Sequence, residues 1–124
     1  MSKLISLLLL ILIISSCSDS GKFEVDLSRK NTSVLIEPNH ILPTSCAIRI
    51  SGETKCSFSI LIPGYGERIF GPGKFNSRIS LEWYDEARNI EIRTDSCTKN
   101  DKIYLYYRFS SRYFGQRTDW QDLE

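Results

Sequence analysis

The chain has 124 residues, with 16 Lys and Arg against 15 Asp and Glu, 4 Cys and a single His. This length suits one domain of ordinary size and excludes a second. The near-zero net charge gives no electrostatic reason to expect nucleic acid or a strongly acidic polymer as a partner.

The chain opens with a sequence typical of an export signal. Lys3 precedes an apolar run over residues 4–14, and two serines follow before Cys17. An apolar run of this length is typical of a secretory signal peptide and is short for a permanent membrane-spanning helix. The sequence Ile-Ser-Ser-Cys at residues 14–17 resembles the lipobox of bacterial lipoproteins, in which a peptidase cuts just before a cysteine whose thiol is lipidated.

This resemblance implies a signal peptide at residues 1–16 and a mature chain that begins with lipidated Cys17. Acyl chains on Cys17 would hold the protein at an envelope membrane, since each buried methylene contributes about 0.8 kcal/mol. Residues 17–22 are then expected to form the lipidated residue and a flexible tether. Ser18 resembles the signal that directs such proteins to the outer membrane, so in a Gram-negative cell we expect an outer-membrane anchor facing the periplasm. The alternatives are an ordinary signal peptide with an incidental Cys17, or an uncleaved anchor.

After the tether, the sequence predicts short strands and no convincing helix. Polar and apolar residues alternate in short runs, and Gly, Pro, Asn and Asp cluster between the runs. We expect seven or eight antiparallel strands over residues 23–111, in an all-β sandwich or a partly open barrel. Residues 112–124 lack a period and are expected to form a tail that packs its aromatic residues across an open end or hangs free. The expected strands cover residues 22–27, 32–37, 46–50, 56–62, 67–70, 78–84, 90–94 and 102–110.

The cysteines that follow Cys17 predict one disulfide. The strands at 46–50 and 56–62 are expected to pair as a hairpin with a three-residue loop, in which Cys46 and Cys56 are diagonal neighbours too far apart to bond. We therefore expect Cys97 to pair with Cys46 or Cys56, leaving one thiol. A five-residue loop would instead place Cys46 against Cys56, and that pairing stays open.

The sequence does not favour catalysis. The single histidine, His40, lies in a predicted loop and is expected to be a surface residue rather than the base for a nucleophile. The carboxylates of Glu82, Asp85, Glu86 and Glu91 cluster around one turn, where we expect them to be solvated. No CxxC motif is present and His40 is the single histidine, so we do not expect a metal site, and we expect no other cofactor. Because the histidine and the carboxylates do not favour catalysis, we expect a protein that is not an enzyme.

The strand at residues 102–110 offers a candidate binding surface. If Ile103, Leu105 and Phe109 point inward, Tyr104, Tyr106 and Arg108 share the outer face. Tyr and Arg are enriched in protein-binding hot spots. The alternative is that the C-terminal tail covers the two tyrosines.

These features together predict a membrane-anchored, non-catalytic protein-binding module, such as an immunity or inhibitor protein. The alternative is a structural or assembly lipoprotein that belongs to an envelope complex or associates with peptidoglycan.

Overall fold

The computed structural model describes residues 19–39, 41–84, 86–94, 97, 101–111 and 117–123. These residues form nine β-strands, and among them no helix is long and apolar enough to span a bilayer. The strands are β1 (Ser20–Asp26), β2 (Asn31–Ile36), β3 (Ser45–Thr54), β4 (Phe58–Ile62), β5 (Gly66–Phe70), β6 (Gly73–Glu82), β7 (Arg88–Thr94), β8 (Lys102–Ser110) and β9 (Arg117–Asp122).

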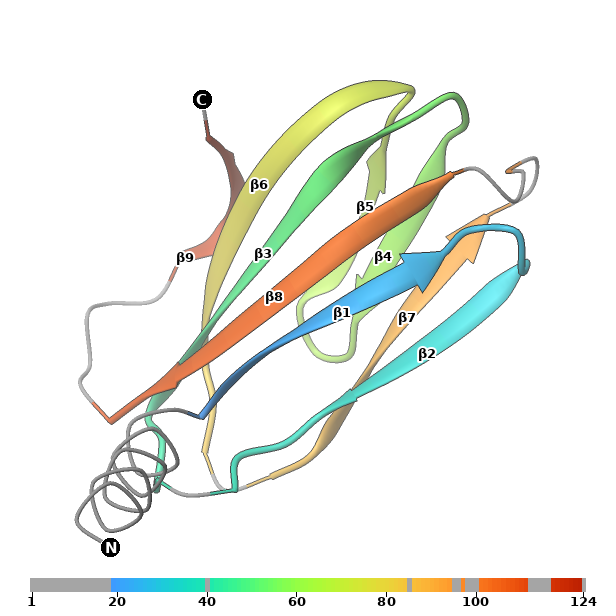
Figure 1. The fold of residues 1–124 in the computed structure, drawn as a ribbon. Helices are drawn as coiled ribbons and strands as arrows, with labels where there is room; N and C mark the ends of the chain where they lie inside the picture. Colours follow the sequence, from blue (N-terminus) through green and yellow to red (C-terminus); the bar gives the residue numbers. More distant parts are fainter. Residues whose placement is uncertain are drawn as a thin grey trace, which may run out of the picture.

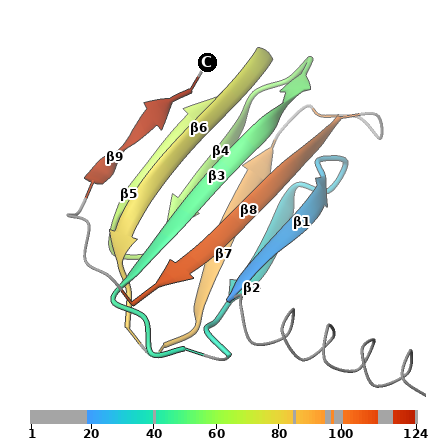
Figure 2. The ribbon, with the colours of Figure 1, turned by 60° about the vertical axis from the view of Figure 1, so that its left-hand side comes forward.

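The strands build two sheets that face each other, which confirms the expected all-β sandwich. One sheet has five strands in the order β1-β8-β3-β6-β9, and the other has four in the order β2-β7-β4-β5. All of the pairings are antiparallel. Figure 2 shows the five-stranded sheet in front, running from β9 through β6, β3 and β8 to β1, with the four-stranded sheet behind it.

The chain changes sheets at almost every connection, which corrects the expected hairpins. The strands β3 and β4 belong to different sheets, as do β6 and β7, and of the described strands only β4 and β5 are both consecutive and paired. The predicted hairpin of residues 46–50 with 56–62 is therefore wrong. Alternation identifies which side chains of a strand point inward. It does not tell whether the inward residues of two strands lie side by side in one sheet or face each other across the core of a sandwich.

The predicted inward positions form the core. In β6 and the residue after it, Ile79, Leu81 and Trp83 are buried, and in β8 Ile103, Leu105 and Phe109 are buried. Both sheets contribute to one continuous apolar cluster. Burial of this kind provides the main favourable free energy of folding.

The folded body extends beyond the predicted bounds at both ends. The strand β1 begins at Ser20, inside the expected tether, because it pairs with β8 from that residue onward. Within β1, Gly21 lies opposite Tyr107, and a Cβ at this position would lie 2.6 Å from the tyrosine ring. At the other end β9 pairs with the edge of β6 through an irregular register, which explains why its sequence shows no simple alternation.

One disulfide joins two of the connections between the sheets. Cys56, between β3 and β4, is bonded to Cys97, between β7 and β8, across 41 residues of sequence. The expected pairing of Cys97 with Cys46 or Cys56 is thereby resolved, and Cys46 is the buried free thiol. The backbone N–H of Lys55 also donates to the Asp101 carboxylate at 3.0 Å, so the same two connections are held together twice.

Candidate binding face

Tyr104, Tyr106 and Arg108 lie on the outer face of the five-stranded sheet. They alternate along β8 with the buried side chains of Ile103 and Leu105, as the sequence predicted. Both tyrosines are half-buried and Arg108 is exposed. The strand β8 lies between β1 and β3, one strand in from the edge of the sheet (Figure 2), so the three residues are flanked by a strand on each side.

The strand register places further cations beside these residues. Tyr106 lies opposite Lys22 of β1 on one side and Arg49 of β3 on the other, and Arg49 in turn lies opposite Arg78 of β6. Neighbouring strands are about 4.8 Å apart, so Lys22, Tyr106, Arg49 and Arg78 form one row across four strands. In the next row towards the start of β1, Arg108 stands between Ser20 and Ala47. We call this surface the basic face and define it as Lys22, Arg49, Arg78, Tyr104, Tyr106 and Arg108.

The cations pack on the aromatic rings. The ammonium nitrogen of Lys22 lies 4.5 Å from the centre of the Tyr104 ring and 5.5 Å from that of Tyr106. The guanidinium carbon of Arg49 lies 4.3 Å from the centre of the Tyr106 ring. Such contacts are worth about 0.5–1 kcal/mol each at exposed sites. They hold long side chains in place, which reduces the entropy lost when a partner binds.

Acidic residues on this side of the sheet include Glu24, which stands opposite Tyr104 in the row next to that of Lys22 and Tyr106. Asp26 and Glu53 share the end row with Lys102, and Glu24 forms an ion pair with Lys102 at 3.2 Å. Within the described part of the chain, no carboxylate lies within ion-pair distance of Arg49, Arg78 or Arg108. The overall charge balance of the sequence therefore conceals a local excess of positive charge.

The described C-terminal strand does not cover the tyrosines. It adds to the sheet beside β6, at the edge opposite β1, and Trp120 packs edge-on against Phe70 with ring centres 5.3 Å apart. Trp120 therefore lies in a strand at the sheet edge, where a tail without strand structure was expected. The other two aromatic residues of that tail, Tyr113 and Phe114, lie outside the described residues.

Searches of protein families and of curated proteins find no match to this chain. Among solved structures, the fold is similar to PliG of Aeromonas hydrophila, a periplasmic inhibitor of g-type lysozyme, with a TM-score of 0.47, 10% identity, and coverage of 76% of this chain and 89% of that one. It is also similar to the carbohydrate-binding module CBM36, solved with calcium and xylotriose, with a TM-score of 0.33, 17% identity, and coverage of 73% of this chain and 87% of that one. At these values neither structure identifies a partner for this chain.

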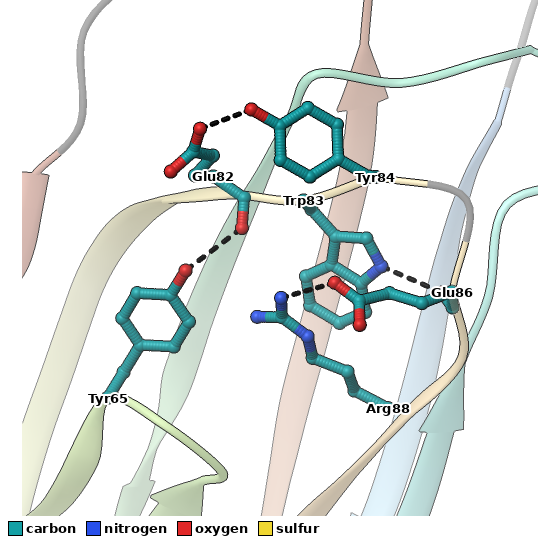
Figure 3. Close-up of polar contacts among 6 residues, drawn as sticks. All are labelled: Tyr65, Glu82, Trp83, Tyr84, Glu86 and Arg88. Atoms are coloured by element: carbon teal, nitrogen blue, oxygen red, sulfur yellow. Dashed lines mark hydrogen bonds and ion pairs between the residues drawn. The ribbon is translucent and has the colours of Figure 1, made fainter.

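A second cluster of polar and aromatic groups closes one end of the sandwich (Figure 3). The guanidinium carbon of Arg88 lies 4.5 Å from the centre of the Trp83 ring and 5.3 Å from that of Tyr65. Arg88 forms an ion pair with Glu86, whose backbone carbonyl accepts a hydrogen bond of 2.9 Å from the Trp83 indole. The Tyr65 hydroxyl donates to the carbonyl of Glu82 at 3.0 Å. Burial opposes the charge on Arg88, whereas the Glu86 carboxylate and the Tyr65 phenol favour it, and the net effect raises the pKa of Arg88.

The described acidic residues noted in the sequence pair with neighbouring side chains, in this second cluster or close to it in β7. Glu82 accepts a hydrogen bond from the Tyr84 hydroxyl, Glu86 pairs with Arg88, and Glu91 pairs with Arg93 at 2.9 Å. Asp85 lies outside the described residues. Three of the four carboxylates therefore serve as acceptors for neighbouring side chains.

A groove of about 670 Å³ opens beside β5 and β9. Phe70 and Phe75 form its apolar part, and an ion pair of 3.0 Å between Arg68 and Asp122 joins the two sheets there. The Asp122 carboxylate also accepts a hydrogen bond from the Ser77 hydroxyl. The groove also carries Glu53 and Lys74, which lie opposite each other in β3 and β6, so cations and carboxylates are balanced in its lining, unlike in the basic face.

The remaining residues singled out in the sequence are Cys46, Cys17 and His40. Cys46 is fully buried, and burial raises the pKa of its thiol to about 12, which keeps it protonated and a poor nucleophile. Cys17 and His40 lie outside the described residues.

Sequence reasoning did not include Lys22, Arg49 and Arg78 in the candidate surface. Each stands at an outward position of an alternating strand, but only the register between strands brings Lys22 and Arg49 beside Tyr106, and Arg78 beside Arg49.

Proposed function

We propose that this protein is a lipid-anchored envelope module that binds another protein through its basic face and performs no catalysis itself. The observation that carries the proposal is the row Lys22, Tyr106, Arg49 and Arg78 on the outer face of the sheet. Lys22 and Arg49 pack on the Tyr106 ring, and Arg78 lies opposite Arg49. Tyr and Arg supply a large share of binding energy in protein interfaces.

The charge of the face indicates the kind of partner. Opposite charge on two surfaces speeds their association and disfavours incorrect partners. We therefore expect the partner to present a surface rich in Asp and Glu to the cations of the face. A secreted toxin or a wall-cleaving enzyme with such a surface would make this protein an immunity or inhibitor protein.

The anchor in this proposal is acylated Cys17, supported by the lipobox-like sequence at residues 14–17. In a Gram-negative cell, Ser18 favours an outer-membrane location facing the periplasm.

Capture from envelope and secreted fractions tests the proposal. The full-length acylated protein is compared with the charge-reversal variants Arg49→Glu and Arg93→Glu, since Arg93 is an exposed arginine on the opposite sheet. We expect one stoichiometric acidic protein to be captured by the unmodified protein and by Arg93→Glu, with at least a tenfold loss in Arg49→Glu.

The identity of the captured protein separates the alternatives. A secreted protein supports the inhibitor or immunity function, and a fixed envelope complex supports the assembly function. Equal capture by both variants would contradict the basic face as the binding site, and turnover of wall fragments by the purified protein would contradict the non-catalytic proposal.

A further inference from the structure

The described chain begins with a carboxylate that fixes a distant loop. Asp19 lies just before β1 and is buried, and its carboxylate accepts backbone hydrogen bonds from Asn39 at 3.1 Å and Ile41 at 3.0 Å. Its backbone carbonyl accepts a bond of 2.9 Å from Phe109. Asp19 is therefore part of the fold although it lies only two residues after Cys17 in the sequence, where a flexible tether was expected.

The same bonds identify one end of the sandwich. Beyond Ile41, Thr44 donates its backbone N–H to Ser110 at 2.8 Å and accepts one from Trp83 at 3.2 Å. The start of β1, the β2–β3 loop, the β6–β7 connection and the end of β8 thus meet at a single end, at the bottom of Figure 1. We call it the Asp19 end.

Apolar side chains project from the Asp19 end. Leu42, the residue after Ile41, is 76% exposed, and Tyr84 on the β6–β7 connection is 54% exposed. The turn at the far end of β1 instead exposes Ser28, Arg29 and Lys30. An exposed Leu and an exposed Tyr at one end of the molecule are residues suited to the boundary between lipid headgroups and acyl chains.

The distance from the anchor to this end is short. Two residues span at most about 7 Å of extended chain between Cys17 and Asp19. The headgroup layer on each side of a bilayer is about 5–7 Å thick. Acyl chains on Cys17 would thus place the Asp19 end at the membrane surface.

We propose that the Asp19 end rests in the headgroup layer of the membrane, with Leu42 and Tyr84 inserted. This inference rests on the acylation of Cys17 in the proposed function. The contact is shallow, because Glu37 and Glu86 are exposed at the same end and cannot enter the hydrocarbon. The basic face then stands at the side of an upright sandwich, accessible to a partner instead of pressed against lipid.

Site-specific fluorescence tests this orientation. The full-length protein carries Leu42→Cys, labelled with an environment-sensitive dye, and is reconstituted in vesicles of phosphatidylethanolamine and phosphatidylglycerol that contain a headgroup-level nitroxide quencher. Labelling of the acylated protein is selective because the Cys17 sulfur carries lipid, Cys56 and Cys97 are bonded to each other, and Cys46 is buried. The matched control is Arg29→Cys, at the opposite end of β1, and Tyr84→Cys provides a second probe should the first variant fail to fold.

We expect the dyes at positions 42 and 84 to shift to the blue and lose most of their emission to the quencher, while the dye at position 29 does neither. Mass spectrometry of the same samples reports acylation. Acylated protein whose dyes at 42 and 84 behave like that at 29 would overturn the orientation alone. Protein that retains its leader without acyl chains would overturn both the anchor and the orientation.

Discussion

The guanidinium carbon of Arg49 lies 4.3 Å from the centre of the Tyr106 ring, on the outer face of a five-stranded sheet whose other face covers the core. The two residues come from adjacent strands, β3 and β8, that are 57 positions apart at this pair. A cation fixed on an aromatic ring in the middle of a sheet is already arranged to meet a carboxylate, which is why we place binding here.

Replacing one outer tyrosine, Tyr104→Thr, should lower the free energy of unfolding by about 1 kcal/mol or less. Threonine keeps the preference for β structure, and the main loss is the single cation–π contact with Lys22. Tyr107→Thr is the matched control on the inward side of β8, where Tyr107 packs on Phe23 and Phe109. It should cost about 2–4 kcal/mol in urea unfolding. Equal losses in the two proteins would mean that Tyr104 belongs to the core.

Arg88→Met should lower the free energy of unfolding by about 1–3 kcal/mol, because it leaves Glu86 without its ion pair and removes the cation stacked between Trp83 and Tyr65. Arg93→Met removes the partner of Glu91 in an exposed pair and should cost about 0.5 kcal/mol or less. Urea unfolding measures both variants. A neutral Arg88→Met would show that the second cluster does not support the fold.

Alternation of polar and apolar residues predicts which face of a strand a side chain lies on, but not which strand lies beside it. The outward positions of Tyr104 and Tyr106 follow from Ile103 and Leu105 being apolar, because period two depends only on the strand itself. The position of Arg49 beside Tyr106 depends on how β3 pairs with β8 across 57 residues, and no local pattern encodes that register.

The disulfide also shows that local sequence patterns do not determine which strands lie side by side. The prediction that Cys97 bonds to Cys46 or Cys56 is confirmed, although the hairpin from which it was argued does not form. Cys46 is separated from Cys56 because β3 and β4 lie in different sheets.

The strand β9 was not predicted because it adds to the edge of β6 with an irregular register.

Removing the disulfide with Cys56→Ser and Cys97→Ser should cost about 4 kcal/mol, since the bond closes a loop of 41 residues in the unfolded chain. Reductant should lower the urea midpoint of the natural protein and leave that of the double variant unchanged. A natural protein whose midpoint is insensitive to reductant would contradict this role.

Cys46 should react with thiol reagents only as fast as the protein unfolds, because its side chain is fully buried and burial raises its pKa from 9.0 to about 12. A pKa raised in the folded state contributes stability below pH 9 that is lost as the pH rises towards 12. The difference in unfolding free energy between the natural protein and Cys46→Ala should therefore shrink over this alkaline range. Rapid labelling of the native protein at neutral pH would contradict the burial.

Docking of β9 should weaken in acid. Hydrogen bonds from Ser77 and Arg68 lower the pKa of Asp122 below its ordinary value of 3.8. A lowered pKa contributes stability above pH 3.8 that is lost as the pH falls through the folded-state value. The indole N–H resonance of Trp120 should shift in that range, should already be shifted at neutral pH in Asp122→Asn, and should be unaffected by Asp119→Asn. If the Trp120 resonance of Asp122→Asn showed the same acid transition as that of the natural protein, the transition would belong to another group.

Photocrosslinking in living cells tests the binding face most directly. A benzoylphenylalanine replaces Ser51, beside Tyr104 on the outer face of the five-stranded sheet, or Ser59, at an outward position of the four-stranded sheet. We predict one acidic envelope or secreted protein crosslinked at position 51, lost when Arg49→Glu is added, and no such adduct from position 59. Adducts that are absent at 51, or that form equally at 51 and 59, would contradict the account.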